Sequence, residues 1–287
     1  MNVPDAIARF RLNPPHPFVN GENVQKYQEH FLQKYIVAFG DSGMWYMHTQ
    51  LSLFDSVYRL RKLEEIVNVN DAQEYGPPSP QQCLRIGRAN LPFHPAFYCC
   101  QSPSTAIAEM KKWNGLNVKY VLSKWKKRKP ETLFNVVPTY SSHVDHKSHA
   151  AVVVERNVKG DQQTRNNILA FTLFLGDELL ASNDYSICAN FSHQILYTGK
   201  MDVLTYPSVV NPLEINFAFS PRILERKELY LDRVYTIEPL ENNQATIFHI
   251  GMFGNRTVPE WYLFRDLDRK GDIFMQAKDD LFRDTIV

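Results

Sequence analysis

Long apolar stretches and a basic leader are absent from this 287-residue sequence. It has no run of about 18 apolar residues, and its start, Met1 to Asp5, contains neither a basic nor an apolar segment. A membrane-spanning helix needs about 20 apolar residues, and a secretory leader needs a basic segment followed by an apolar one. We therefore expect a cytoplasmic protein with no membrane partner.

A charge excess of either sign is also missing. The chain has 32 Lys and Arg residues against 31 Asp and Glu residues, a net charge of +1, so nothing in the balance requires nucleic acid. One basic stretch, Lys124 to Lys129, carries a tryptophan among its lysines and could bind nucleic acid. We interpret it as the solvated face of a helix or as a turn, and we expect no nucleic-acid partner.

Only four cysteines occur, too few and too poorly spaced for a disulfide framework. Cys99 and Cys100 are adjacent, so on a strand their side chains point to opposite faces. We interpret them as small, reduced core residues. The sequence also contains no glycine-rich phosphate loop, dinucleotide fingerprint or CxxC pair.

Two other groups of residues could carry chemistry. His143, Asp145, His146 and His149 could ligate zinc, but their spacing fits no recognised zinc set, so a solvated loop without metal is the alternative that we favour. The segment that ends at Ser42, Phe39-Gly-Asp-Ser, resembles the nucleophile block of GDSL-type hydrolases. These enzymes also need an Asp three residues before a late histidine, whereas the chain has Thr there, so we expect only a turn.

The N-terminal part is predicted to be helical after an irregular arm over residues 1–20. Apolar residues recur at helical spacing from 24 to 67, and a Gly-Asp-Ser-Gly sequence interrupts them, which predicts helices over 24–38 and 43–67. A proline-rich stretch over 74–80 marks the best candidate boundary. We therefore divide the chain into an N-terminal helical extension, 1–78, a core, 79–240, and a C-terminal extension, 241–287.

The core is expected to contain an insertion over residues 130–200. Within it, the pattern predicts a strand over 151–154, a polar loop over 156–164 and an apolar segment of undecided type over 168–180. Beyond the insertion we expect core strands at 203–204, 216–219 and 234–237. The charged tail over 265–283 is predicted to be a helix that docks through Phe274 and Leu281.

The most informative stretch runs from Arg85 to Glu109. Residues 96–100 read as a buried strand, and Ser102-Pro103 reads as a helix N-cap followed by proline at the first helical position. On that helix Glu109 lies at the edge of the apolar face, close to Tyr98 of the strand. Because a partly buried carboxylate needs a partner, Arg85 or Arg88 is expected to provide one.

These residues resemble the RES domain, a family named for its Arg, Glu and Ser. The resemblance rests on the blocks Gly87-Arg-Ala-Asn90, Phe97-Tyr98, Ser102-Pro-Ser-Thr-Ala-Ile-Ala-Glu109, Tyr206-Pro-Ser-Val209 and Asn216-Phe-Ala-Phe219, in the order of the family pattern. It implies an α+β fold with an ADP-ribosyltransferase-like split β-sheet core, flanking helices and, here, an N-terminal helical extension. It also implies that NAD is the substrate and that no other cofactor is needed.

The family activity is cleavage of the nicotinamide–ribose bond of NAD by water or phosphate. The resemblance implies a bacterial toxin that depletes NAD and is neutralised by a separately encoded antitoxin or immunity protein. Homo-oligomerisation is also compatible with the sequence. Two alternatives stay open, namely transfer of ADP-ribose to a protein, and a non-catalytic module that binds NAD or ADP-ribose.

The resemblance also assigns roles to individual residues. Arg88 and Arg85 would hold the pyrophosphate, and Glu109 would bind a ribose hydroxyl and stabilise the developing cation. Tyr98 would stack on a ring of NAD, and Ser208 would donate a hydrogen bond to the ribose or the carboxamide. Asn90 would contact the substrate beside Arg88.

Overall fold

The computed structural model describes residues 2–40, 44–114, 118–143, 149–181, 184–211, 213–240, 245–254 and 256–282. The contacts group the chain into two compact units, each assembled from three stretches. The first unit contains Met1–Leu51, Pro78–Phe97 and Leu133–Pro221, and the second contains Ser52–Pro77, Tyr98–Thr132 and Arg222–Val287. The predicted α+β class with flanking helices and an N-terminal helical extension is confirmed.

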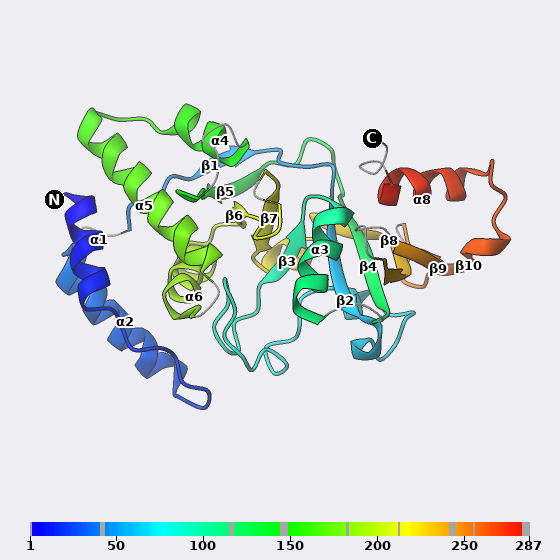
Figure 1. Ribbon diagram of the computed structural model, residues 1–287, viewed down its shortest axis with the longest axis horizontal. Helices are drawn as coiled ribbons and strands as arrows, with labels where there is room; N and C mark the ends of the chain where they lie inside the picture. Colours follow the sequence, from blue (N-terminus) through cyan, green and yellow to red (C-terminus); the bar gives the residue numbers. More distant parts are fainter. Residues whose placement is uncertain are drawn as a thin grey trace. The chain divides into compact units, whose positions relative to one another are not determined.

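Helices of the first unit pack around a cluster of aromatic rings. The helices are α1 (Val3–Leu12), α2 (Val24–Phe39), α5 (Gln162–Leu180) and α6 (Ser186–His193). In Figure 1, α1 and α2 lie side by side. At the centre of the cluster, the ring of Phe191 lies 5.1 to 5.8 Å from the rings of Phe31, Tyr35, Phe171 and Phe174.

A small sheet completes the first unit. Its strand order is β1 (Thr49–Leu51), β5 (Phe134–Pro138), β6 (Val203–Pro207) and β7 (Ile215–Phe219). The β5–β6 pair is parallel and the other two pairs are antiparallel. Every residue of β6 and β7 is buried, as is typical of central strands. This unit also contains α4 (His149–Asn157) and a π-helical turn, η3 (Gln194–Thr198).

The second unit is an antiparallel sheet with helices on its apolar face. Its strand order is β3 (Phe97–Cys100), β2 (Ser56–Lys62), β4 (Tyr120–Lys127), β8 (Leu229–Pro239), β9 (Ala245–Met252) and β10 (Glu260–Leu263). Ala106 and Ile107 of α3 (Pro103–Asn114) and Ala277 of α8 (Asp272–Phe282) join one hydrophobic cluster with residues of β2, β4, β8 and β9. Short helical segments are η1 (Leu63–Glu65), η2 (Ala72–Tyr75), α7 (Arg222–Glu225) and η4 (Phe264–Asp266).

Several predicted elements are confirmed. Helix α2 matches the helix predicted over 24–38, and β6, β7 and β8 contain the strands predicted there. The strand predicted over 96–100 is β3, which begins one residue later, at Phe97. Helix α3 begins at Pro103, and the Ser102 hydroxyl accepts a hydrogen bond from the Thr105 amide at 3.2 Å, as expected of an N-cap. The tail helix is also present, with Leu281 packed against the hydrophobic cluster and Phe274 stacked on Phe264.

Three predicted elements are wrong. Residues 3–12 form a helix instead of an arm, because Val3, Ala6, Ile7 and Phe10 bury one helical face and Pro4 suits a first turn. Residues 49–51 and 56–62 form strands instead of one helix over 43–67. Residues 151–154 belong to α4 and are not a strand, and the undecided segment over 168–180 is helical. The polar loop is correspondingly short, since α4 ends at Asn157 and α5 begins at Gln162.

Candidate functional site

The loop that carries Arg88 consists of two consecutive tight turns. The Gly87 amide donates to the Asn90 carbonyl at 3.0 Å, and the His94 amide donates to the Leu91 carbonyl at 3.0 Å. The second turn has Pro92 and Phe93 at its centre, and Phe93 has a φ of 65°. A positive φ at that position defines a type II turn and normally requires glycine. The loop therefore has the turn shape that its proline favours, but with a phenylalanine in a left-handed conformation.

Asn90 holds this loop together from inside. Its side chain is buried, and its Nδ2 atom donates to the carbonyl oxygens of Arg85 at 2.9 Å and Leu91 at 3.3 Å. These bonds fix the backbone on both sides of Arg88. Asn90 is thus engaged in the loop's own structure, and its predicted contact with substrate stays a prediction.

Arg88 and Arg85 differ in their surroundings. The Arg88 guanidinium lies over the ring of Tyr185, with 5.4 Å between its Cζ atom and the ring centroid, and its Nε and Nη2 atoms are buried. Tyr185 is the N-cap residue of α6 and comes from the predicted insertion. The Arg85 side chain is exposed. Arg88 is therefore the better placed of the two for a fixed contact, while both roles stay predictions.

The loop that carries Arg88 is also anchored at its C-terminal end. The Tyr197 hydroxyl donates to the Pro95 carbonyl at 2.6 Å, and the rings of His94 and His193 meet edge to face at 4.5 Å. The His193 ring stacks on Tyr197, and its Nδ1 atom lies 2.8 Å from Nε2 of Gln28 in α2. Residues of the helical part of the first unit therefore hold this loop in place.

Ser208 lies in the same unit, at the end of β6. It is fully buried, and its Oγ accepts hydrogen bonds from the amides of Val210 at 3.2 Å and Asn211 at 3.3 Å. This is the geometry of a serine that stabilises a turn. The hydroxyl proton can still be donated elsewhere, so the predicted contact with NAD is compatible with this role and stays a prediction.

Tyr98 and Glu109 belong to the second unit. Tyr98 is half-buried on β3, and Glu109 is half-buried on α3, two residues after the buried Ile107. This is the position that the helical periodicity predicts for Glu109, at the edge of the apolar face. The six predicted site residues are thus divided, with Arg85, Arg88, Asn90 and Ser208 in the first unit and Tyr98 and Glu109 in the second.

Sequence reasoning missed Arg59 as a candidate. It lies on β2, and its Nε and Nη1 atoms are buried although the residue as a whole is partly exposed. Burial lowers the pKa of its guanidinium to about 10, while Cys99 and Tyr98 of β3 act in the opposite direction. The sequence signal for Arg59 was its place among the apolar residues Val57, Tyr58 and Leu60, as in a buried strand. The prediction of a helix over 43–67 hid this signal.

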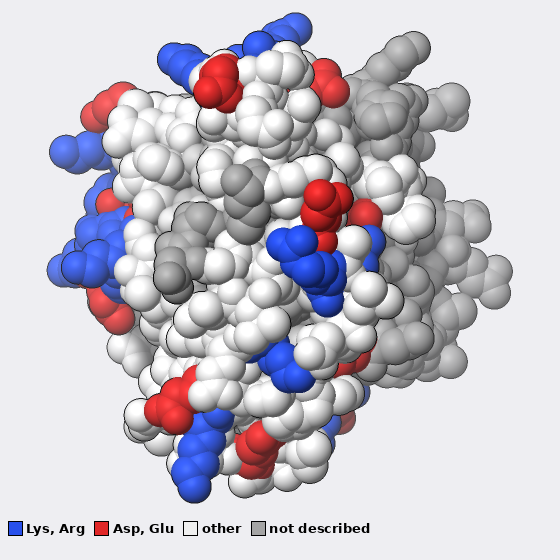
Figure 2. All heavy atoms as spheres, turned by 90° about the vertical axis from the view of Figure 1, so that its left-hand side faces the viewer, with Lys and Arg blue, Asp and Glu red and all other residues white. Residues whose placement is uncertain are grey.

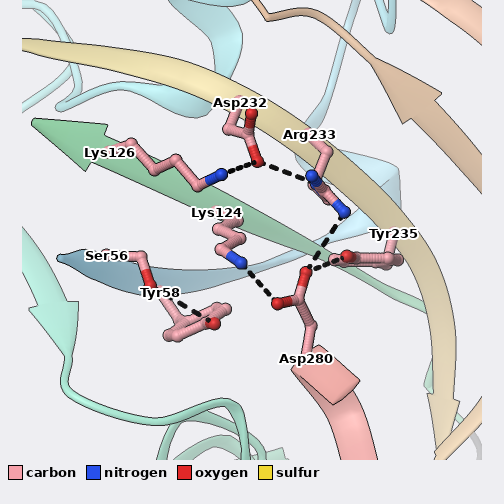
Figure 3. A network of polar contacts seen from close by, with 8 residues as sticks. All are labelled: Ser56, Tyr58, Lys124, Lys126, Asp232, Arg233, Tyr235 and Asp280. Atoms are coloured by element: carbon pink, nitrogen blue, oxygen red, sulfur yellow. Dashed lines mark hydrogen bonds and ion pairs between the residues drawn. The ribbon is translucent and has the colours of Figure 1, made fainter. Parts of the chain in front are cut away.

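The second unit also contains a buried network of charges, which Figure 3 shows. Asp280 of α8 accepts from Lys124 of β4 and from the Tyr235 hydroxyl of β8, and it lies 3.5 Å from Nη1 of Arg233. The side chains of Lys124, Arg233 and Asp280 are each at most 10% exposed. Burial lowers the pKa of Lys124, and the hydrogen bond that Lys124 donates to Asp280 opposes this shift. Burial raises the pKa of Tyr235 well above its ordinary value.

A second carboxylate extends this network toward solvent. Asp232 bridges Arg233 at 2.8 Å and Lys126 at 3.2 Å, and Lys126 is 34% exposed. A cavity of about 650 Å³ adjoins the network and is lined by side chains of both signs, including Lys126, Asp279 and Asp280. The network therefore attaches α8 to the sheet by ionic contacts that supplement its apolar face (Figure 3).

The network corrects the interpretation of the basic stretch at 124–129. Lys124 and Lys127 are buried in β4, so the stretch is not a solvated helix face or a turn. Lys127 instead donates to the Pro130 carbonyl at 2.6 Å and to the Ser52 hydroxyl at 2.5 Å.

On the face that carries α1, α2 and α5, charged side chains of both signs are scattered over a largely uncharged surface (Figure 2).

The other candidate sites receive less support. Among the described residues, no group of three His, Cys, Asp or Glu side chains is arranged to hold a metal ion. Asp145 and His146 of the possible zinc site and Ser42 of the GDSL-like block lie outside the described residues. Cys83, Cys99 and Cys188 are buried, and burial raises the pKa of the thiols of Cys99 and Cys188 far above the ordinary value, as expected for inert core cysteines. None of the described helices has the length and apolarity needed to cross a membrane.

Comparison with known proteins gives a family for this chain. No curated protein matches the sequence. Among solved structures, a chain from the crystal structure of the M. tuberculosis MbcT-MbcA toxin-antitoxin complex is similar at 14% identity and a TM-score of 0.41, with 66% of this chain and 87% of that chain covered. The family model described as RES domain matches residues 56–234, more than half of the 287 residues. The resemblance noted in the sequence is therefore confirmed, and the chain belongs to the RES-domain family.

Proposed function

We propose that this protein is an NAD-cleaving enzyme that breaks the nicotinamide–ribose bond and depletes cellular NAD in the manner of a toxin. The observation that carries the proposal is membership of the RES-domain family together with Arg88, Tyr98, Glu109 and Ser208 at the matching motif positions. The fixed loop around Arg88 and the half-buried position of Glu109 support it.

The chemistry requires stabilisation of positive charge on the ribose. When the bond between C1′ and the pyridinium nitrogen breaks, its electron pair leaves with neutral nicotinamide and the ribose becomes oxocarbenium-like. A carboxylate beside the ribose, which we assign to Glu109, stabilises that state more than the ground state and so accelerates the reaction. Water or phosphate then bonds to C1′; with water, the products are ADP-ribose, nicotinamide and one proton.

The remaining residues bind and orient the dinucleotide. Arg88 pairs with the pyrophosphate through charge-assisted hydrogen bonds, and Arg85 adds a weaker, exposed contact. Tyr98 stacks on a ring of NAD, and the Ser208 hydroxyl donates a hydrogen bond to the ribose or the carboxamide. Asn90 keeps the loop of Arg88 in shape. NAD is the substrate, and the scheme requires no other cofactor. A separately encoded neutralising partner is part of the same proposal.

The test is incubation of the purified protein with NAD in buffers with and without phosphate, followed by mass spectrometry of the products. We expect nicotinamide release that Glu109→Gln reduces at least about 100-fold. Free ADP-ribose would identify water as the acceptor, and its phosphorylated form would identify phosphate. Nicotinamide release only after addition of a protein acceptor would favour ADP-ribosyl transfer. Intact NAD that nevertheless stabilises the protein against heat would indicate a binding module and contradict the proposal.

A further inference from the structure

A second cavity in the second unit lies on the part of the sheet formed by β8, β9 and β10. It has a volume of about 430 Å³ and is lined by Leu63, Val69, Lys119, Phe248 and Trp261, among others. Its size and its mostly apolar lining with a few polar groups are those of small-molecule sites. It is separate from the proposed catalytic residues, none of which lines it.

The indole of Trp261 is held in this cavity by two features. Its Nε1 atom donates to Oδ1 of Asn70 at 2.8 Å, which fixes the orientation of the ring. One ring face lies on Gly251 of β9, where an added Cβ would come within 2.9 to 3.1 Å of three indole carbons. Trp261 is only half-buried and lines the cavity, so part of its ring is accessible from there. The site therefore offers an aromatic surface in a fixed position.

The charge of the cavity has one sign. Among the described residues that line it, Lys119 is the only Lys, Arg, Asp or Glu. Its Nζ atom lies 5.0 Å from the centroid of the Phe248 ring, so the ammonium group sits beside an aromatic surface, and none of the described lining residues carries a carboxylate. An anionic group of a ligand could approach Lys119 without repulsion from any described lining residue, while the ring of the ligand contacts Trp261 and Phe248.

From this arrangement we infer a binding site for a small planar aromatic anion, with its ring on Trp261 and Phe248 and its anionic group at Lys119. The apolar side chains of Leu63 and Val69 close the sides of the cavity. The amide nitrogen of Asn70 can donate a further hydrogen bond, because its Oδ1 atom is the one that binds Trp261. The inference goes beyond the proposed function and does not depend on it.

The probe is 1-naphthoate, with the uncharged 1-naphthamide as its matched control. Binding is followed through the indole N–H resonance of Trp261 in a two-dimensional nitrogen–proton spectrum, assigned by comparison with Trp261→Phe. We expect a saturable shift with a Kd of about 1 mM or below. The amide should bind about two- to fivefold more weakly, because it lacks the charge that pairs with Lys119.

Two variants test the assignment. Lys119→Gln should bind naphthoate and naphthamide equally, whereas Lys278→Gln, an exposed lysine on α8 that does not line the cavity, should retain the preference. Gly251→Ala should weaken both probes, since the added methyl group displaces the indole. An unchanged fold is checked by the remaining resonances. A Trp261 resonance that does not move at about 10 mM naphthoate, or a preference for the anion that survives Lys119→Gln, would overturn the inference.

Discussion

One residue in the loop of Arg88, Phe93, has a backbone conformation that residues other than glycine disfavour. Phe93 has a φ of 65° and is 53% exposed, so it bears left-handed strain and buries little apolar surface in return. For a residue other than glycine this conformation costs roughly 1–2 kcal/mol. We expect Phe93→Gly to raise the free energy of unfolding by up to about 1 kcal/mol after the extra entropy of glycine in the unfolded chain is subtracted.

Denaturant unfolding measures this effect, and a residue shortly before the loop provides a control. Leu84 is similarly exposed but has no positive φ, so Leu84→Gly should be neutral or destabilising. Destabilisation of similar size in both variants would show that the Phe93 side chain contributes more through contacts than it loses through strain.

Tyr185 acts on a different property, the position of the Arg88 guanidinium. If Arg88 binds the pyrophosphate of NAD as proposed, loss of the ring in Tyr185→Leu should raise KM for NAD about two- to fivefold, with a smaller effect on kcat. Tyr185→Phe retains the ring and should behave as wild type. Equal losses in the two variants would assign the effect to the hydroxyl and not to the contact with Arg88.

His193 gives the stability of the loop anchor a pH dependence. Burial first, and then the charge of His94, lowers the pKa of His193 from 6.5 to about 4 in the folded protein. The unfolded chain therefore binds a proton at a higher pH than the folded protein does. This contribution to stability is present above about pH 6.5 and is lost as the pH falls toward 4. His193→Gln should flatten the pH dependence of the unfolding free energy in that window, and an unchanged slope would contradict the assignment.

At the scale of elements, the sequence was sufficient where local chemistry specified one structure. The Ser102-Pro103 start of α3 and the apolar strands around Phe97 and Phe217 combine a capping or proline signal with a clear period. In β2, Tyr58 and Leu60 pack on one face while Arg59 lies on the other, yet Met47, Leu51, Phe54 and Tyr58 also fit a helical period. Pairing with β4, which lies about 60 residues later, selects the strand. The sequence of β2 itself therefore contains no signal that separates a strand from a helix.

The charge network is even harder to predict from local sequence, because its residues come from β4, β8 and α8, which are far apart in the chain. Removing Asp280 would leave Lys124 buried without its carboxylate partner and Arg233 with Asp232 alone. Loss of one partner of a buried ion pair typically costs about 3–5 kcal/mol. We expect Asp280→Ala to lower the free energy of unfolding by that amount. The neighbouring Asp279 is exposed, so Asp279→Ala should change it by less than about 0.5 kcal/mol. Equal, small effects in the two variants would mean that α8 is held by its apolar face alone.

At the scale of the whole molecule, each compact unit is built from three separate stretches of chain. The predicted boundary between residues 78 and 79 was based on a proline-rich stretch. Such a stretch indicates a turn or loop, but it does not indicate which parts of the chain pack together. Helices α1 and α2 share their aromatic cluster with α5 and α6, and β2 pairs with both β3 and β4. A long-range association of this kind can be found only from three-dimensional contacts.

This organisation predicts the result of cutting the chain at that boundary. A fragment of residues 79–287 lacks β2, which leaves the edge of β4 unpaired, and lacks α1 and α2, which exposes the rings of Phe171, Phe174 and Phe191. We expect the fragment to be aggregated or to bind a hydrophobic dye, without a cooperative unfolding transition. The control is the intact chain with a protease site inserted in the exposed Ser79–Gln82 segment. It should remain folded and associated after cleavage, because only the hydrogen bonds of this turn are lost and the sheet pairing and the aromatic cluster are kept. Cooperative unfolding of the isolated fragment would show instead that residues 1–78 are a dispensable extension of a core that folds without them.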